Sequence, residues 1–230
     1  MVLDGDTVVR PDGSVYGGSP GRLFKLNPAA QRAFAELRDG AVRTAAGASL
    51  GRRFSDAGVL HPQAGPPAPL SVTVLVPVRD RLAELDRCLS TLAHAEVLVV
   101  DDGSSDAAGV AAVAERYGAQ LVRRPVNGGP AAARNTGLAA ITTDLVACCD
   151  SDCTAPPDWI GALSGHFADP LVAAVAPRVR ARPAPGAGLA ARYAAQRSPL
   201  DLGDRPARVL PMTRVAYLPT AAVLLRMSAV

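Results

Sequence analysis

The chain has 230 residues, of which 49% are hydrophobic and 20% charged, and its formal net charge is +3. This is enough apolar material for one large domain, or for a medium domain with a smaller one, and no segment has the composition of a disordered acidic or basic tail. Aromatic residues, which stack on bases, make up only 4%, and no run approaches the roughly 18 apolar residues of a membrane span, so neither a nucleic-acid-binding nor a membrane-spanning protein is predicted.

The N-terminal segment, MVLDGDTVVRPDG, is acidic and polar and lacks the features of a secretory signal. Four cysteines in a chain without such a signal indicate free thiols in a reducing compartment. We therefore expect a cytoplasmic protein.

Residues 1–60 have the pattern of a small unit with short strands and two helices. Apolar pairs flank the turn at 11–14, where PDGS favours a reversal of the chain. Asn27-Pro28 is typical of a helix start, because asparagine caps free N–H groups and proline suits the first helical position. A second helix over 48–56 and a closing strand at 58–60 complete the unit.

This small unit resembles the winged-helix domains of modified-peptide biosynthesis. Those domains bind a leader peptide by adding it as a strand to a sheet edge. The alternative is a domain that only packs on the rest of the protein, and the sequence leaves both open.

Residues 61–71, HPQAGPPAPLS, are rich in proline and are predicted to be a linker to a domain over 72–230. Beyond the linker, strands are expected over 72–78, 96–100, 120–122, 145–149 and 171–176, and helices over 81–93, 107–117, 131–140 and 159–167. Repeated strand-helix-strand units predict an α/β fold, in which a mostly parallel sheet carries helices on both faces.

Polar residues follow the carboxyl ends of these strands, which is where an open parallel sheet binds its ligands. They are Pro77 and Arg79 at the first strand, Asp101 and Asp102 at the second, and Asp150 and Asp152 at the fourth. The first turn, VPVRDR, lacks the glycines of a dinucleotide-binding fingerprint. We therefore expect a nucleotide site of another kind at this edge.

The segment VACCDSDCTAP places three cysteines and two aspartates around the end of the fourth strand. Side chains two residues apart in an extended segment point the same way, so Asp150 and Asp152 can face one pocket. Two hard oxygen ligands suit Mg²⁺ or Mn²⁺, which keep open positions for phosphate oxygens. The cysteine spacing is not that of a zinc site, and Cys148 and Cys149 lie within an apolar run, so buried thiols are predicted there.

Four motifs occur together over residues 71–226: VPVRDR, VVDDGSSD, NGGPAAARNTGL and the Asp-Ser-Asp loop. In combination they resemble family 2 glycosyltransferases of the GT-A fold, which are metal-dependent, inverting and use nucleotide sugars. The roles that the resemblance implies are uridine binding for Pro77, Arg79, Asp101 and Asp102, nucleotide contact for Arg134, ribose and sugar contact for Asp150, and metal binding for Asp152 with Asp150 beside it.

Two of the motifs also have a purely structural interpretation. Asp102-Gly103-Ser104 is a sequence that caps helices, and Asn127-Gly128-Gly129 permits a tight turn. Trp159 is expected to pack at a helix start. The histidines show no metal-binding spacing and are expected to be exposed; they are His61, His94 and His166.

With its leading unit, the whole chain resembles the mycofactocin-system glycosyltransferases, which glycosylate a peptide-derived redox cofactor. This implies transfer of a sugar, with glucose expected first, from a UDP-sugar to a hydroxyl of a modified peptide or peptide-derived cofactor. Two alternatives stay open. A sugar nucleotidyltransferase would need a loop rich in glycine and basic residues in place of VPVRDR, and a non-catalytic protein would only sense a nucleotide sugar.

The general base of the family is an acid in an E-D motif well after the metal-binding loop. No acid between Trp159 and Val230 stands in such a motif, and the chain ends at RMSAV in an apolar run without a stop signal. We therefore expect an incomplete C-terminal end, with the catalytic base beyond Val230. Residues 217–225, YLPTAAVLL, resemble the strand on the acceptor side, which makes Thr220 a candidate there.

Overall fold

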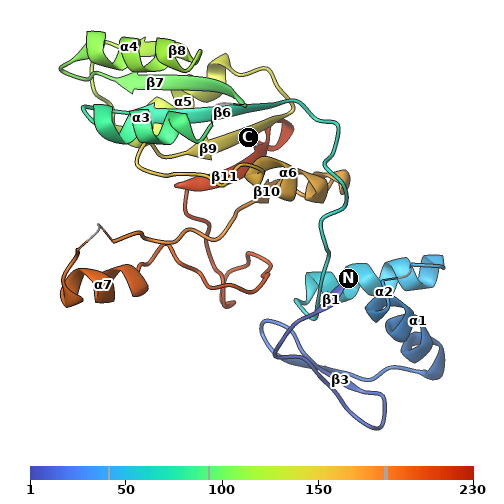
Figure 1. Ribbon diagram of the computed structural model, residues 1–230. Coiled ribbons are helices and arrows are strands. Elements are labelled where there is room, and N and C mark those ends of the chain that lie inside the picture. Colours follow the sequence, from blue (N-terminus) through green and yellow to red (C-terminus); the bar gives the residue numbers. More distant parts are fainter. Residues whose placement is uncertain (41, 93, 184–185) are drawn as a thin grey trace. The chain divides into compact units, whose positions relative to one another are not determined.

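The computed structural model describes residues 1–40, 42–92, 94–183 and 186–230 (Figure 1). The chain divides into two compact units, Met1–Gln63 with Leu202–Leu218, and Ala64–Asp201 with Pro219–Val230. Among the described residues, no helix is both long enough and apolar enough to span a membrane.

The described residues of the small unit form two antiparallel sheets and two helices. Strand β1 (Val2–Leu3) pairs with β5 (Leu60–His61), and a second sheet has the order β2-β3-β4. The remaining bounds are β2 (Val8–Val9), β3 (Val15–Gly17), β4 (Arg22–Phe24), α1 (Pro28–Arg38) and α2 (Ala45–Asp56). The predicted helix start is confirmed, since Asn27 Oδ1 accepts a hydrogen bond of 2.9 Å from the Ala30 N–H.

Three aromatic rings form the centre of the small unit. Phe54 is fully buried, and its ring meets those of Phe24 and Phe34 edge-on, with centroids 5.1 and 5.2 Å away. His61, expected to be exposed, is instead buried, and its Nε2 lies 2.8 Å from Asp4 Oδ2. The reason is the β1–β5 pairing, which brings the first residues of the chain beside the end of the unit.

Leu202–Leu218 groups with the small unit, although the sequence pattern assigned it to the larger domain. Polar contacts hold it there. Arg205 lies 2.8 Å from Asp6, Arg208 pairs with Asp56, and the Arg214 N–H donates to Ser19 Oγ at 3.2 Å. The resemblance of this unit to winged-helix domains stays a prediction.

The larger unit is built on a six-stranded sheet with the order β10-β11-β9-β6-β7-β8. Its strands are β6 (Val72–Val78), β7 (Glu96–Asp102), β8 (Gln120–Arg124), β9 (Leu145–Cys149), β10 (Ala174–Val175) and β11 (Ala222–Arg226). The strands β9, β6, β7 and β8 are parallel, while β11 and β10 join antiparallel at one edge. The predicted mostly parallel sheet is confirmed, and the strand expected over 171–176 is reduced to two residues.

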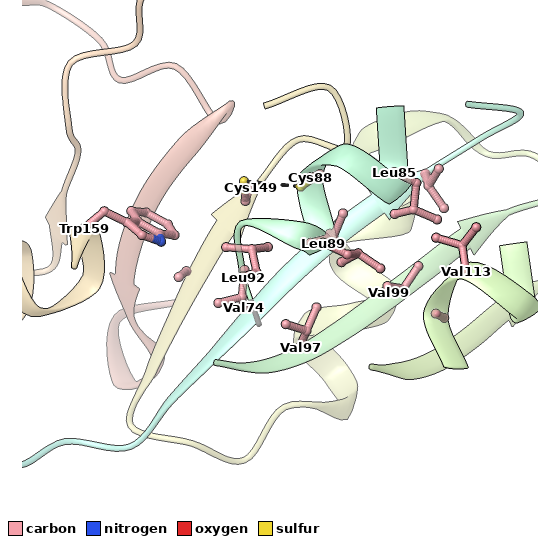
Figure 2. Close-up of a cluster of buried hydrophobic side chains, with 14 of the residues drawn as sticks. Val74, Leu85, Cys88, Leu89, Leu92, Val97, Val99, Val113, Cys149 and Trp159 are labelled. Atoms are coloured by element: carbon pink, nitrogen blue, oxygen red, sulfur yellow. Dashed lines mark hydrogen bonds between the residues drawn. The ribbon is translucent and has the colours of Figure 1, made fainter. Parts of the chain in front are cut away.

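Helices cover both faces of this sheet, as predicted. They are α3 (Leu82–Ser90), α4 (Ala107–Arg116), α5 (Gly129–Ala140) and α6 (Trp159–Ser164). A further helix, α7 (Leu189–Gln196), has no buried residue, and short 3₁₀ turns lie at Gly165–Ala168 and Met227–Ala229. Val74 and Val99 point to the face under α3 and α4 (Figure 2). Leu75 points to the opposite face against α5, where a Cβ on Gly137 would lie 2.2 Å from a Leu75 methyl. Trp159, the first residue of α6, is buried as expected, in the same cluster as Val74 and Val99.

Candidate functional site

The sequence-predicted polar residues gather at the carboxyl edge of three adjacent parallel strands. Strands β7 and β9 flank β6, with Val78 opposite Asp101 and Leu75 opposite Cys148. Pro77 is half-buried within β6, and the exposed Arg79 is the first residue after the end of this strand. Because parallel strands end at one edge, the fold brings the ends of β6, β7 and β9 together.

Thr220 also lies at this edge. The Asp150 N–H donates to the Ala221 carbonyl oxygen at 3.0 Å, which extends the pairing of β9 with β11 by one residue. Thr220 precedes Ala221 and is exposed. The structure therefore places it beside the loop that contains the two predicted metal ligands.

Asp101 is almost fully buried, with 1% of its surface exposed, and both of its carboxylate oxygens have internal partners. Oδ1 accepts a hydrogen bond of 2.9 Å from the Ser104 N–H, and Oδ2 pairs with Arg123. Arg123 also donates to the Ser104 carbonyl oxygen at 3.2 Å. This carboxylate therefore ties the turn after β7 to the end of β8.

Asp102 holds the loop that contains Gly128 and Gly129 through similar contacts. Its oxygens accept hydrogen bonds from the Gly128 N–H at 3.0 Å and the Gly129 N–H at 2.7 Å. Arg124 Nε lies 2.9 Å from Oδ1, as an ion pair rather than an aligned hydrogen bond. Gly103 has a φ of +71°, and a Cβ there would lie 2.8 Å from the Asn127 backbone nitrogen. The helix-capping interpretation of Asp102-Gly103-Ser104 is wrong, because the residue that caps α4 is Asp106, whose Oδ1 accepts a hydrogen bond of 2.8 Å from the Gly109 N–H. Nucleotide contact by Asp101 and Asp102 stays a prediction.

Arg123 and Arg124 were not singled out as members of this edge. The sequence did contain the signal, because two acids end one parallel strand and two arginines end the next. The register sets Asp101 opposite Arg123 and Asp102 opposite Arg124.

Asp150 forms an ion pair with Arg134, which reaches it from α5. The carboxylate is 33% exposed and the arginine side chain 15%. Burial raises the pKa of Asp150, while the charge of Arg134 acts in the opposite direction. Arg134 Nε is buried and has no hydrogen-bond acceptor among the described residues. Because an unpaired buried donor is unfavourable, this arginine suits a site that an anionic ligand completes.

Asp152 faces Arg81, which precedes α3, with 2.8 Å between Oδ2 and Nη1. Both side chains are about half exposed, at 50% and 58%. Arg81 is part of VPVRDR, yet its contact with the Asp-Ser-Asp loop was not predicted, because the loop lies about seventy residues further along the chain.

The donor set of this loop fits a magnesium or manganese ion. Within the described ranges, no group of three or more histidine, cysteine or acidic side chains converges as a complete metal site. Mg²⁺ in phosphate-binding sites needs only one or two carboxylates, because substrate phosphates and water supply the other ligands. Asp150 and Asp152 provide such a pair.

The nearby cysteines are thiols. Burial raises the pKa of Cys148 to about 11 and that of Cys153 to about 12. The pKa of Cys149 is also raised. The larger cause is its contact with Cys88, whose sulfur lies 4.0 Å away, and the second cause is burial (Figure 2). The predicted buried thiols are confirmed for Cys148 and Cys149, and Cys153 is partly buried.

Comparisons with known proteins agree with this geometry. Residues 73–229 match the family model of glycosyl transferase family 2. Over 222 residues the chain is 45% identical to the pre-mycofactocin glycosyltransferases of Mycobacterium tuberculosis strains CDC 1551 / Oshkosh and ATCC 25618 / H37Rv. The match covers 95% of this chain and 47% of each relative, so the chain spans about half the length of these relatives.

Among solved structures, the chain is similar to a crystal structure of S. aureus TarS 1-349 and to one of TarS 1-349 in complex with UDP-GlcNAc. Both give a TM-score of 0.51 at 20% identity over 69% of this chain, and over 47% and 46% of the TarS chains. At this identity the likeness shows the fold alone.

Proposed function

The chain belongs to glycosyl transferase family 2, with the GT-A fold, and we propose that it binds a UDP-sugar together with a divalent cation at the carboxyl edge of its sheet. The observation that carries this proposal is the meeting of Asp150 and Asp152 with Arg134 and Arg81. Carboxylates suit a hard dication, and guanidinium groups suit diphosphate oxygens. The other group of two carboxylates and two arginines at this edge, Asp101 and Asp102 with Arg123 and Arg124, is less suited because backbone N–H groups also bind its carboxylates.

In this proposal Asp152 and Asp150 hold Mg²⁺ or Mn²⁺, which neutralises charge on the leaving diphosphate when it is bound. Arg134 supplies the positive charge of its guanidinium, whose side chain is 15% exposed, to the nucleotide. Pro77, Arg79 and the turn at Asp101–Asp102 form the uridine side. Since both of those carboxylates have internal partners, they act through position: Asp101 holds the turn at Ser104, and Asp102 holds Gly128 and Gly129.

We infer the reaction from the relatives, which are about twice as long as this chain. The whole protein transfers a sugar, glucose in the first instance, with inversion to a hydroxyl of a pre-mycofactocin-type acceptor. Thr220 lies on the acceptor side, and the general base is unassigned. Family membership supports this reading over a sugar nucleotidyltransferase.

Calorimetric titration with UDP tests the donor site. We expect UDP to bind at least about tenfold more tightly with Mn²⁺ than with a chelator. This factor is of the usual size for two ligands whose binding is coupled. Asp152→Asn should remove most of this difference because it removes a metal ligand. The control is Asp86→Asn, an exposed aspartate paired with Arg116 at 2.6 Å, which should behave as wild type. Equal UDP affinity with and without metal in the wild-type chain would refute the metal assignment.

A further inference from the structure

Two ion pairs at the Asp-Ser-Asp loop differ in how firmly they are held. The Arg134–Asp150 pair is the more buried, and Arg134 projects from the body of α5. The Arg81–Asp152 pair lies at the surface, and Arg81 stands just before the first residue of α3. An exposed pair of this kind contributes little to stability, so Arg81 can change its partner at low free-energy cost.

The four charges act as one group. They sum to a formal charge of zero, and the charges of Asp152 and Arg81 both act on Asp150. A dication that approaches Asp152 alone meets the positive charge of Arg81. A diphosphate that takes Arg81 alone leaves the negative charge of Asp152 beside it without a partner. Each ligand is therefore disfavoured without the other, since like charges at short range repel.

Binding of both ligands removes these conflicts. The dication takes the place of Arg81 at Asp152, and the freed guanidinium can donate hydrogen bonds to the diphosphate, a geometry that arginine suits. No carboxylate or guanidinium is then left without a partner of opposite charge.

Building on the proposed function of this edge, we propose that Arg81 couples cation binding to diphosphate binding. It pairs with Asp152 in the ligand-free protein and moves to the diphosphate when a divalent cation binds at Asp152. By linkage, UDP then raises the affinity for the cation by the same factor by which the cation raises the affinity for UDP.

Calorimetry on the 230-residue chain tests this, with Mn²⁺ titrated in the absence and in the presence of UDP. The variants are Arg81→Gln, Arg81→Lys and the control Arg116→Gln, which removes an arginine from an ion pair of similar exposure. In wild type and the control we expect UDP to raise Mn²⁺ affinity by about tenfold or more. In Arg81→Gln, Mn²⁺ alone should bind about threefold to tenfold more tightly, and the effect of UDP should fall below about threefold. Arg81→Lys, which keeps the charge, should lie in between.

Two results would overturn the inference while leaving the proposed function intact. One is an Arg81→Gln variant in which UDP raises the affinity for Mn²⁺ by the same factor as in wild type. The other is the same variant with no gain in affinity for Mn²⁺ alone, which would mean that Arg81 does not compete for Asp152. If the folded wild-type chain binds no UDP with Mn²⁺, the proposed function fails, and this inference fails with it.

Discussion

Asp101 and Asp102 at the end of β7 differ from Asp150 and Asp152 after β9 in burial and in partners. The first two are 1% and 4% exposed, and backbone N–H groups and two arginines saturate their oxygens. The second two have side chains 33% and 50% exposed, and each pairs with one arginine. The same residue type at one sheet edge thus positions a loop where backbone donors surround it, and stays available to a ligand where only an arginine faces it.

Exchange of one carboxylate for an amide should have very different effects on stability in the two regions. Asp102→Asn places an NH₂ group against the Gly128 and Gly129 donors and removes the charge opposite Arg124, so we expect a loss of about 3–5 kcal/mol in the free energy of unfolding. Asp152→Asn should change it by less than about 1 kcal/mol, because its ion pair is exposed. Denaturant titration measures both. Losses of equal size would contradict the difference in role.

The turn beside Asp102 offers a second test of its structural role. Gly103→Ala combines a positive φ with a Cβ 2.8 Å from backbone, so we expect a loss of about 2–3 kcal/mol. Gly118→Ala is the control, because its φ of +65° is similar and nothing lies within 4 Å of the added Cβ. It should lose about 1–2 kcal/mol from the backbone alone. The same thermal shift in both variants would mean that the Gly103 turn does not need its close approach to Asn127.

The strand that leads to Asp150 gives a smaller effect, which depends on pH. Burial raises the pKa of Cys148 from 9.0 to about 11. The unfolded chain therefore loses this proton first as pH rises, so the free energy of unfolding should fall between pH 9 and 11 by about 1 kcal/mol per pH unit from this thiol. Below pH 9 the contribution is constant. Cys148→Ala should show a shallower decline over this range, and an unchanged slope would show that the thiol is not desolvated.

The core strands were predictable because their signal is local. β6 and β9 begin and end where their continuous apolar runs do. The strand expected over 171–176 was not, because only Ala174–Val175 finds a partner, and that partner is β11, which follows almost fifty residues later. His61 was misjudged for the same reason, since its partner Asp4 lies at the other end of the small unit.

The site was predictable as a set of residues but not as a set of contacts. Asp150 and Asp152 were singled out from the two-residue period of an extended segment, but the structure has a turn there, in which the Cys153 N–H donates to the Asp150 carbonyl oxygen at 2.9 Å. The arginines that face them come from α5 and from the turn before α3, and only the packing of those helices brings them there. The sequence likewise could not tell that Asp102 holds a glycine loop rather than standing free.

Binding of a divalent cation together with a nucleotide diphosphate at the loop Asp150–Asp152 can be seen by paramagnetic broadening of backbone amide signals with Mn²⁺ on the 230-residue chain. With UDP present, substoichiometric Mn²⁺ should broaden the amides of Ser151 and Asp152 first and leave Asp144, at the opposite end of β9, unchanged; without UDP the broadening should be much weaker. Broadening that is centred elsewhere, or that is the same with and without UDP, would mean that this loop does not bind the cation together with the nucleotide.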